Sequence, residues 1–177
     1  MVSAEEYLNS SYHPEREYVD GALLERGEAT ISHGLLQCIV GVNLSAYREK
    51  LRFEPLPSVR TQIIAGFRYR IPDLMLCPVP LPIGKIVDSV PWAVIEILSP
   101  DDSVSGQLAR FRDYKQIGVR HMVLLDPEEH IAYRFEDDSL LRTRFTSLDL
   151  PSGSLPFDTE ALFRQLVEER SEGATLS

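Results

Sequence analysis

The pattern of hydrophobic and polar positions predicts two helices in the first third of the chain. In "SAEE", Ser3 and Glu6 have the spacing of a capping box, so a short helix is expected at the start of the chain. The longest helical pattern covers residues 32–51, with Ser32 as its expected N-cap. Its predicted apolar stripe consists of Leu35, Ile39, Val42 and Ala46.

Two further helices are expected later in the chain. One follows "SPDD" and ends at about Ile117, because Gly118 suits a helix C-terminus. The other covers residues 158–170, and the polar segment 171–177 is expected to be a flexible tail.

Strand patterns alternate with these helices. Two short β-prone runs joined at Asp20-Gly21 predict a hairpin. Six more strands are expected at residues 58–66, 69–77, 92–98, 120–127, 130–137 and 140–147. The order predicts an α/β or α+β domain with a mixed central sheet flanked by helices.

Composition and charge narrow the class of protein. A chain of 177 residues that is 44% hydrophobic suits one compact domain. A net charge of −9 argues against a general electrostatic grip on phosphate backbones, so a nucleic-acid partner would need a local basic patch or a metal ion. Cys38 and Cys77 show no metal-binding spacing and are expected to be buried thiols. With neither a signal-peptide pattern nor a spanning apolar run, we expect a cytoplasmic protein without a membrane partner.

Two carboxylates fall inside predicted apolar strands. Asp73 lies in the strand of residues 69–77, and Glu96 lies in the strand of residues 92–98. A buried carboxylate is costly unless it is paired, so each acid needs compensation. One explanation is a salt bridge to Arg68, Arg70 or Arg110, or a strand end that is open to water. The other is that the two acids lie on neighbouring strands and share a divalent cation.

An ordered set of motifs resembles the Uma-two family, which consists of bacterial proteins of largely unknown function with a restriction-endonuclease-like PD-(D/E)XK core. The resemblance extends from about Tyr7 to Leu166. The matching elements are "EYVDG", His33, Pro72-Asp73, Glu96, Ser99-Pro100, Tyr114, Gly118-Val119 and Asp126-Pro127. The resemblance implies one nuclease-like domain over residues 1–170.

The same resemblance implies roles for three acids. Asp73 and Glu96 would be ligands of Mg²⁺ or Mn²⁺, and Glu17, in "EYVDG", would be a third acidic member of the site. Active members of such a family would cleave phosphodiester bonds of nucleic acid, with DNA as the first expectation.

The chain departs from the nuclease signature at its lysine. The position two residues after Glu96 is Leu98, and the alternative position on the following helix is Arg110. Lys115 is another candidate, but it lies roughly 20 Å along the helix axis from the turn, whereas Arg110 lies about 10–12 Å along it. Arginine stays protonated and cannot act as a base, but it can hold a phosphate oxygen.

Two functions therefore remain open. The first is a Mg²⁺-dependent phosphodiesterase that uses Asp73, Glu96, Glu17 and Arg110. His33, Arg70 and Lys115 are its candidate substrate-binding residues, although a surface histidine and a charge-neutralising arginine are the plain alternatives for the first two. The second function is a catalytically inactive protein of the same fold that binds or assembles, with a homodimer through an exposed strand or loop as one form.

Overall fold

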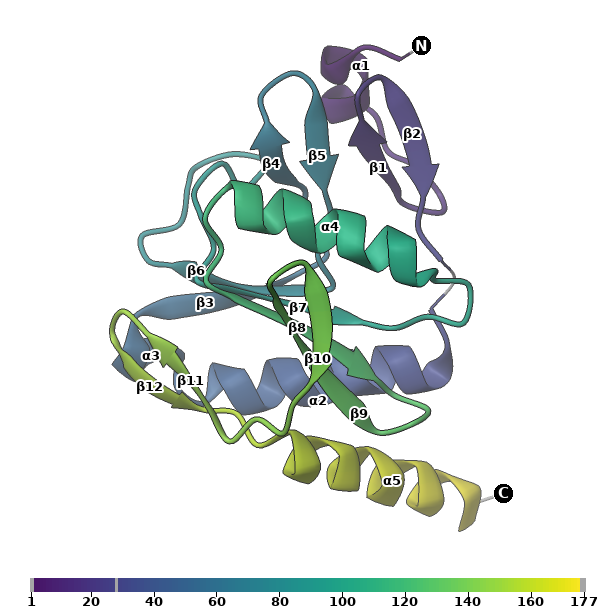
Figure 1. The fold of residues 1–177 in the computed structure, drawn as a ribbon, viewed down its shortest axis with the longest axis vertical. Coiled ribbons are helices and arrows are strands. Elements are labelled where there is room, and N and C mark those ends of the chain that lie inside the picture. The colour runs from purple at the N-terminus through teal and green to yellow at the C-terminus, as the bar shows by residue number, and fades with distance from the viewer. Residues whose placement is uncertain (1, 28, 176–177) are drawn as a thin grey trace.

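The computed structural model describes residues 2–27 and 29–175, which form layers of strands and helices (Figure 1). A six-stranded sheet lies at the centre, and only its β7 and β8 pair is parallel. In spatial order its strands are β10 (Ser139–Arg142), β9 (Ile131–Glu136), β8 (His121–Asp126), β7 (Ala93–Ile97), β6 (Leu74–Pro78) and β3 (Phe53–Pro57). The predicted mixed sheet flanked by helices is confirmed.

A second, antiparallel sheet lies beyond the central one. Its strands are β2 (Ala22–Glu25), β1 (Arg16–Val19), β5 (Arg68–Arg70) and β4 (Thr61–Ile64). β1 and β2 form the predicted hairpin, and both turn residues, Asp20 and Gly21, have positive φ angles.

The strand expected over residues 69–77 is in fact two strands in two sheets. β5 ends at Arg70 in the second sheet, and β6 begins at Leu74 in the central sheet. Pro72 has no N–H to donate to a ladder, so the chain leaves one sheet and enters the other there. Asp73 therefore lies at a junction between sheets. The prediction that it lies inside a strand is wrong.

Helices cover both faces of the central sheet (Figure 1). On one face, α2 (Ile31–Ser45) packs its apolar residues against odd-numbered residues of β7. On the other face, α4 (Val104–Gln116) packs Phe111 and Tyr114 against Val94. The side chains of β7 therefore alternate between two cores, and β7 is buried along its whole length.

Two expectations for α2 are wrong. Its N-cap is Thr30, whose side chain accepts from the backbone N–H of His33 at 3.2 Å, and Ser32 is buried in the first turn. The core face includes Leu36, Ile39, Val40 and Leu44, whereas Val42 is 70% exposed. Adjacent apolar pairs such as Leu35-Leu36 are compatible with two different apolar stripes on the helix. Packing buries the stripe that contains Leu36, whereas the prediction began at Leu35.

The remaining helices begin and end largely as expected. Ser3 caps α1 (Ala4–Asn9), and its side chain accepts from the N–H of Glu6 at 3.1 Å. Ser103 caps α4, which ends just before Gly118, a residue with a positive φ of 93°.

Several elements were not predicted. They are the edge strand β3 and the hairpin of β11 (Ser147–Leu150) and β12 (Gly153–Pro156). The helix expected over residues 32–51 is two helices, since α2 ends at Ser45 and the short helix α3 (Arg48–Leu51) is separate from it. The last helix, α5 (Thr159–Thr175), continues into the segment expected to be a tail, and residues 176–177 of that segment lie outside the described residues. Cys77 is buried as expected, but Cys38 is exposed. Among the helices described, none has both the length and the apolar character that crossing a bilayer requires.

Candidate active site

Asp73 and Glu96 meet at the junction where the chain enters β6. The backbone N–H of Asp73 donates to Oε2 of Glu96 at 3.3 Å, and the N–H of Ile97 donates to Oδ2 of Asp73 at 2.7 Å. Asp73 is 3% exposed and Glu96 is 0% exposed. The expectation that the two acids lie close together is confirmed.

Glu96 points from β7 toward α4, where Tyr114 is also fully buried. The hydroxyl of Tyr114 donates to Oε1 of Glu96 at 2.6 Å. Burial, followed by the charge of Asp73, raises the pKa of Glu96 to about 8. A proton on Glu96 is therefore stable in the folded protein well above the ordinary range of a glutamate.

Arg26 supplies the positive charge at this pair. Its Nη2 forms an ion pair with Oδ1 of Asp73 and lies 4.0 Å from Oε2 of Glu96. Burial alone would raise the pKa of Asp73, but the hydrogen bond to His33 and the charge of Arg26 hold it well below its usual range. One guanidinium thus serves both acids.

The segment that carries Arg26 passes close to the end of β7. A Cβ atom on Gly27 would lie 3.3 Å from Cβ of Ser99, so glycine permits this close approach. Sequence reasoning missed Arg26, because it follows β2 outside any motif and lies 47 residues from Asp73.

His33 and Gln37 approach Asp73 from α2. Nε2 of His33 lies 3.3 Å from Oδ2 of Asp73, and Nε2 of Gln37 donates to the backbone oxygen of Asp73 at 2.6 Å. The other ring nitrogen of His33, Nδ1, is buried and has no hydrogen-bond partner among the described residues. His33 is therefore buried at the site and not a half-exposed helix residue.

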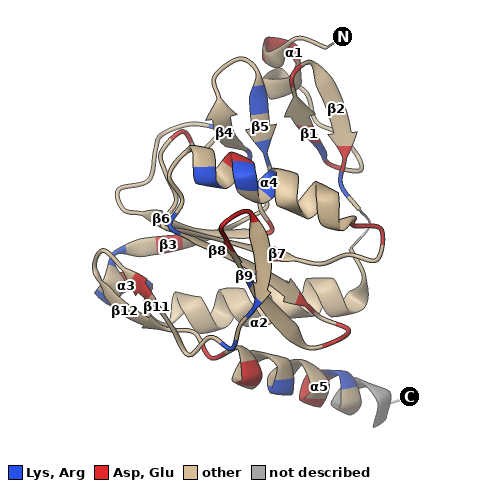
Figure 2. Cartoon of the chain, in the orientation of Figure 1, with Lys and Arg blue, Asp and Glu red and all other residues tan. Residues whose placement is uncertain are grey.

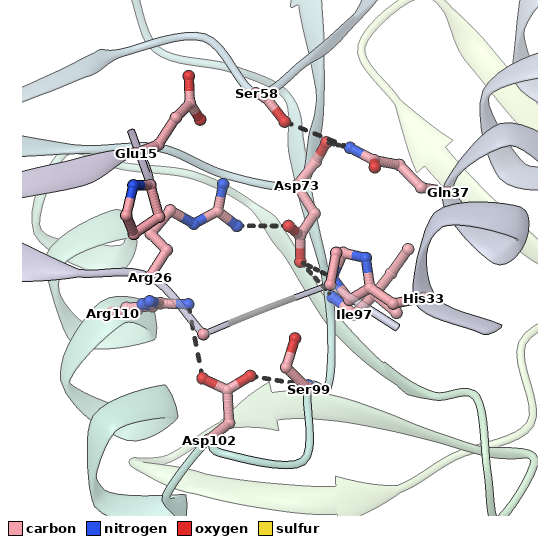
Figure 3. Close-up of a pocket in the computed structure, with 13 residues that line it drawn as sticks. Glu15, Arg26, His33, Gln37, Ser58, Asp73, Ile97, Ser99, Asp102 and Arg110 are labelled. Atoms are coloured by element: carbon pink, nitrogen blue, oxygen red, sulfur yellow. Dashed lines mark hydrogen bonds and ion pairs between the residues drawn. The ribbon is translucent and has the colours of Figure 1, made fainter. Parts of the chain in front are cut away.

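A cavity of about 190 Å³ opens above these groups (Figure 3). Figure 3 shows the guanidinium of Arg26 pointing at the carboxylate of Asp73, with Arg110 nearby. Arg110 comes from α4, and its Nη1 lies 4.0 Å from Oδ1 of Asp102. Two arginines and a histidine border this cavity together with three acids, Glu15, Asp73 and Asp102. The arginines are the groups that could hold a phosphate beside the acidic site.

Glu17 and Arg70 belong to an ion-pair cluster beside the cavity. Oε2 of Glu17 lies 2.7 Å from Nη1 of Arg70 and 3.4 Å from Nε of Arg110, and its Oε1 accepts from the N–H of Ile71 at 3.1 Å. Nε of Arg70 also lies 2.7 Å from Oδ2 of Asp113. Figure 2 shows these opposite charges gathered where β5 passes α4.

This cluster corrects the expectations for the arginines of β5. Arg70 is 6% exposed and uses its nitrogens on Glu17 and Asp113. Arg68 pairs with Asp20 and Asp113. Arg26 takes the role at Asp73 that we had considered for Arg68, Arg70 and Arg110. Arg70 is therefore an ion-pair partner of Glu17 and Asp113 and does not line the cavity above Asp73.

Lys115 lies apart from the site. It is exposed near the end of α4, and its Nζ is 6.0 Å from the ring centroid of Phe135. Arg110 lines the cavity and Lys115 does not, as the distances along the helix axis had indicated.

The donors of this site suit a hard cation. Mg²⁺ takes oxygen ligands and is commonly held by one or two carboxylates together with waters and substrate phosphates. Asp73 and Glu96 supply two such carboxylates, although residues 2–27 and 29–175 contain no group of three or more His, Cys, Asp or Glu side chains placed to hold an ion. The residues therefore fit Mg²⁺ or Mn²⁺ in donor type and charge, provided that Arg26 gives way.

A mixed sheet between helices, with two acids meeting beside a cavity that two arginines border, is the arrangement of a restriction-endonuclease-like domain. The model of the Uma2 family, described as "Putative restriction endonuclease", matches residues 4–162. The chain belongs to this family, the one that its motifs resemble.

A solved structure has the same fold. It is described as a "putative nuclease belonging to DUF820" from Anabaena variabilis and superposes with a TM-score of 0.77 at 20% sequence identity. The match covers 94% of this chain and 99% of that one. No curated protein sequence matches the chain.

Proposed function

We propose that this protein is a Mg²⁺-dependent phosphodiesterase that cleaves nucleic acid. The observation that carries the proposal is the meeting of two buried acids, Asp73 and Glu96, beside a cavity lined by Arg26 and Arg110. A buried acid pair is costly in a structural role alone, and its place at a cavity favours a functional one.

The acids would hold the ion, and the arginines would serve the substrate. Asp73 and Glu96 are the ligands in this proposal, and a bound Mg²⁺ would lower the pKa of a water and polarise the phosphoryl group. Arg110 stabilises negative charge that develops on the phosphate oxygens. Because a guanidinium stays protonated, Arg110 orients and stabilises but does not accept a proton.

Glu17 and His33 act through these residues. Glu17 holds Nε of Arg110 at 3.4 Å and is itself fixed by Arg70, so it is a positioning residue and not a ligand. His33 donates to Asp73 and sets the orientation of that carboxylate.

The size and charge of the site favour a single phosphodiester group as its occupant. A volume of about 190 Å³ is smaller than the roughly 300–1,000 Å³ of sites that enclose drug-sized ligands. The net charge of −9 makes the local pair Arg26 and Arg110 the source of attraction for phosphate. DNA is the first substrate to test, with RNA as the alternative.

The deciding experiment is a cleavage assay on single-stranded and double-stranded DNA and on RNA, with Mg²⁺ or with EDTA. We expect Mg²⁺-dependent cleavage by the wild type and a loss of at least about 1,000-fold in Glu96→Gln. Glu160→Gln is the matched control, because Glu160 is an exposed acid of α5 paired with Arg144. Cleavage that survives in Glu96→Gln would refute the proposal.

Two observations favour a second candidate, a catalytically inactive protein that binds nucleic acid or assembles. Arg26 contacts both acids, and Arg110 stands where the nuclease signature has lysine. On this alternative, the wild type shows no cleavage with any of the substrates. The strand β3, at the edge of the central sheet, would then be the place to look for a homodimer, by light scattering of the wild type.

A further inference from the structure

We propose that Arg26 is a built-in counter-ion that a divalent cation must displace, and that the displaced guanidinium then binds the substrate phosphate. Cation and substrate would therefore bind cooperatively. This inference deepens the proposed function and rests on it.

The first step of the argument concerns the carboxylate oxygens. Oδ2 of Asp73 accepts from the N–H of Ile97, and Oε1 of Glu96 accepts from the hydroxyl of Tyr114. These two donors are parts of the buried core and cannot leave. Oδ1 of Asp73 forms an ion pair with Nη2 of Arg26, and Oε2 of Glu96, which also accepts from the N–H of Asp73, lies 4.0 Å from the same nitrogen. An arriving cation would need these same oxygens.

The second step concerns charge. A divalent cation and a guanidinium on the same oxygens would repel each other strongly in a buried site. The arrangement therefore favours one or the other, and Arg26 leaves when the cation binds.

The third step concerns where Arg26 can go. It borders two cavities: the one above Asp73 and a neighbouring one of about 410 Å³ at the start of α4. Arg110 borders both cavities as well. Arg26 and Arg110 can thus face the same space beside the acids (Figure 3). Glu25, Asp101 and Asp102 border the second cavity too, and Arg110 pairs with Glu17 and Asp102. A phosphodiester between the two guanidiniums would give the displaced Arg26 a further anionic partner beside these acids.

This arrangement couples the binding of the cation to the binding of the substrate. Without substrate, the cation must compete with Arg26 and binds weakly. With substrate, the displaced Arg26 gains a phosphate partner, so the apparent affinity for the cation rises. By reciprocity, the cation raises the affinity for substrate by the same factor.

The test is a calorimetric titration of the full chain with Mn²⁺, with and without a short single-stranded phosphorothioate DNA. Arg26→Gln removes the charge but keeps an N–H donor for Asp73. We expect it to bind Mn²⁺ alone at least about tenfold more tightly than the wild type. Arg26→Lys keeps the charge and should stay within about threefold of the wild type.

The oligonucleotide tests the second half of the inference. It should tighten Mn²⁺ binding by the wild type about fivefold or more and should have no such effect in Arg26→Gln. Arg16→Gln is the matched control, because Arg16 is a partly exposed arginine of the same hairpin that pairs with Glu25. This control should behave as the wild type does in both titrations.

The outcomes separate this inference from the proposed function. Unchanged or weaker Mn²⁺ binding in Arg26→Gln, with wild-type binding that is lost in Asp73→Asn, would overturn the counter-ion role and leave the metal site intact. Tighter binding in Arg26→Gln without nucleic-acid cleavage by the wild type would support the counter-ion role and refute the nuclease. Absence of Mn²⁺ binding in every protein would refute both. Arg26→Met replaces Arg26→Gln if circular dichroism shows that the latter does not fold.

Discussion

The backbone N–H of Asp73 lies 3.3 Å from Oε2 of Glu96, although the two residues are 23 positions apart. This contact brings the acid that precedes β6 against the acid near the end of β7. Because Ile97, the residue after Glu96, also donates its N–H to Asp73, the two carboxylates are held by the backbone itself. The site is therefore a consequence of how β6 pairs with β7.

The protonation of Glu96 makes the stability of the metal-free protein depend on pH. Its pKa rises from 4.5 to about 8 on folding, so between these values the folded state binds more protons than the unfolded state. The free energy of unfolding must then fall as the pH rises through that window. The pKa of Asp73 is lowered on folding, so the ionised Asp73 stabilises the folded state above pH 3.8, the ordinary pKa of an aspartate. This stabilisation is lost only as the pH falls below 3.8, which is outside the window of Glu96.

Urea unfolding of the wild type and Glu96→Gln at pH 5 and pH 8 measures this effect. We expect the wild type to lose about 2–4 kcal/mol relative to the variant between these pH values. An equal pH dependence in both proteins would show that Glu96 is ionised throughout.

The ion-pair cluster of Glu17, Arg70 and Asp113 is predicted to be structural. Arg70→Met removes one of the arginine partners of each of two buried acids and should lower the free energy of unfolding by about 3–5 kcal/mol. The matched control Arg16→Met breaks an exposed ion pair with Glu25 and should cost about 1 kcal/mol or less. Similar losses in both variants would contradict this interpretation of the cluster.

Tyr114→Phe removes a single buried hydrogen bond from Glu96. The hydroxyl donates to Oε1 at 2.6 Å, so the variant leaves a buried carboxylate oxygen without that donor. Thermal or urea unfolding should show a loss of about 1–3 kcal/mol. A variant as stable as the wild type would mean that Glu96 finds another donor, such as a buried water.

Arg110 is predicted to act on the phosphate by charge and geometry. In single-turnover cleavage, Arg110→Met should lower the rate constant by about 100-fold to 1,000-fold, whereas Arg110→Lys should stay within about tenfold of the wild type. If wild type is inactive and Arg110→Lys alone gains cleavage, the natural protein is a disabled nuclease and the second candidate function is correct.

The sequence was sufficient for the elements that have strong local signals. The Asp20-Gly21 hairpin, the strand around Glu96 and the helix that ends before Gly118 follow from turn chemistry and hydrophobic period. The edge strand β3 was missed because its two prolines, Pro55 and Pro57, argue against a strand, and only an edge position tolerates them.

The candidate site, too, could be predicted only in part from the sequence. Burial of Asp73 and Glu96 was predictable, because each stands among apolar residues in the sequence. Their counter-ion was not, because Arg26 reaches them from a connection that has no periodic pattern. Pairing between distant segments depends on tertiary packing. The sequence therefore favoured Arg68, Arg70 and Arg110, which are nearer in sequence or in helical register, over Arg26.

The most direct test of the central claim is a crystal structure of the protein with Mn²⁺ and a short single-stranded phosphorothioate DNA, with an anomalous difference map. The account predicts one peak within about 2.0–2.4 Å of a carboxylate oxygen of Asp73 and of Glu96, with Arg26 turned away from both. An empty map at this position, with Arg26 still paired to Asp73, would contradict it.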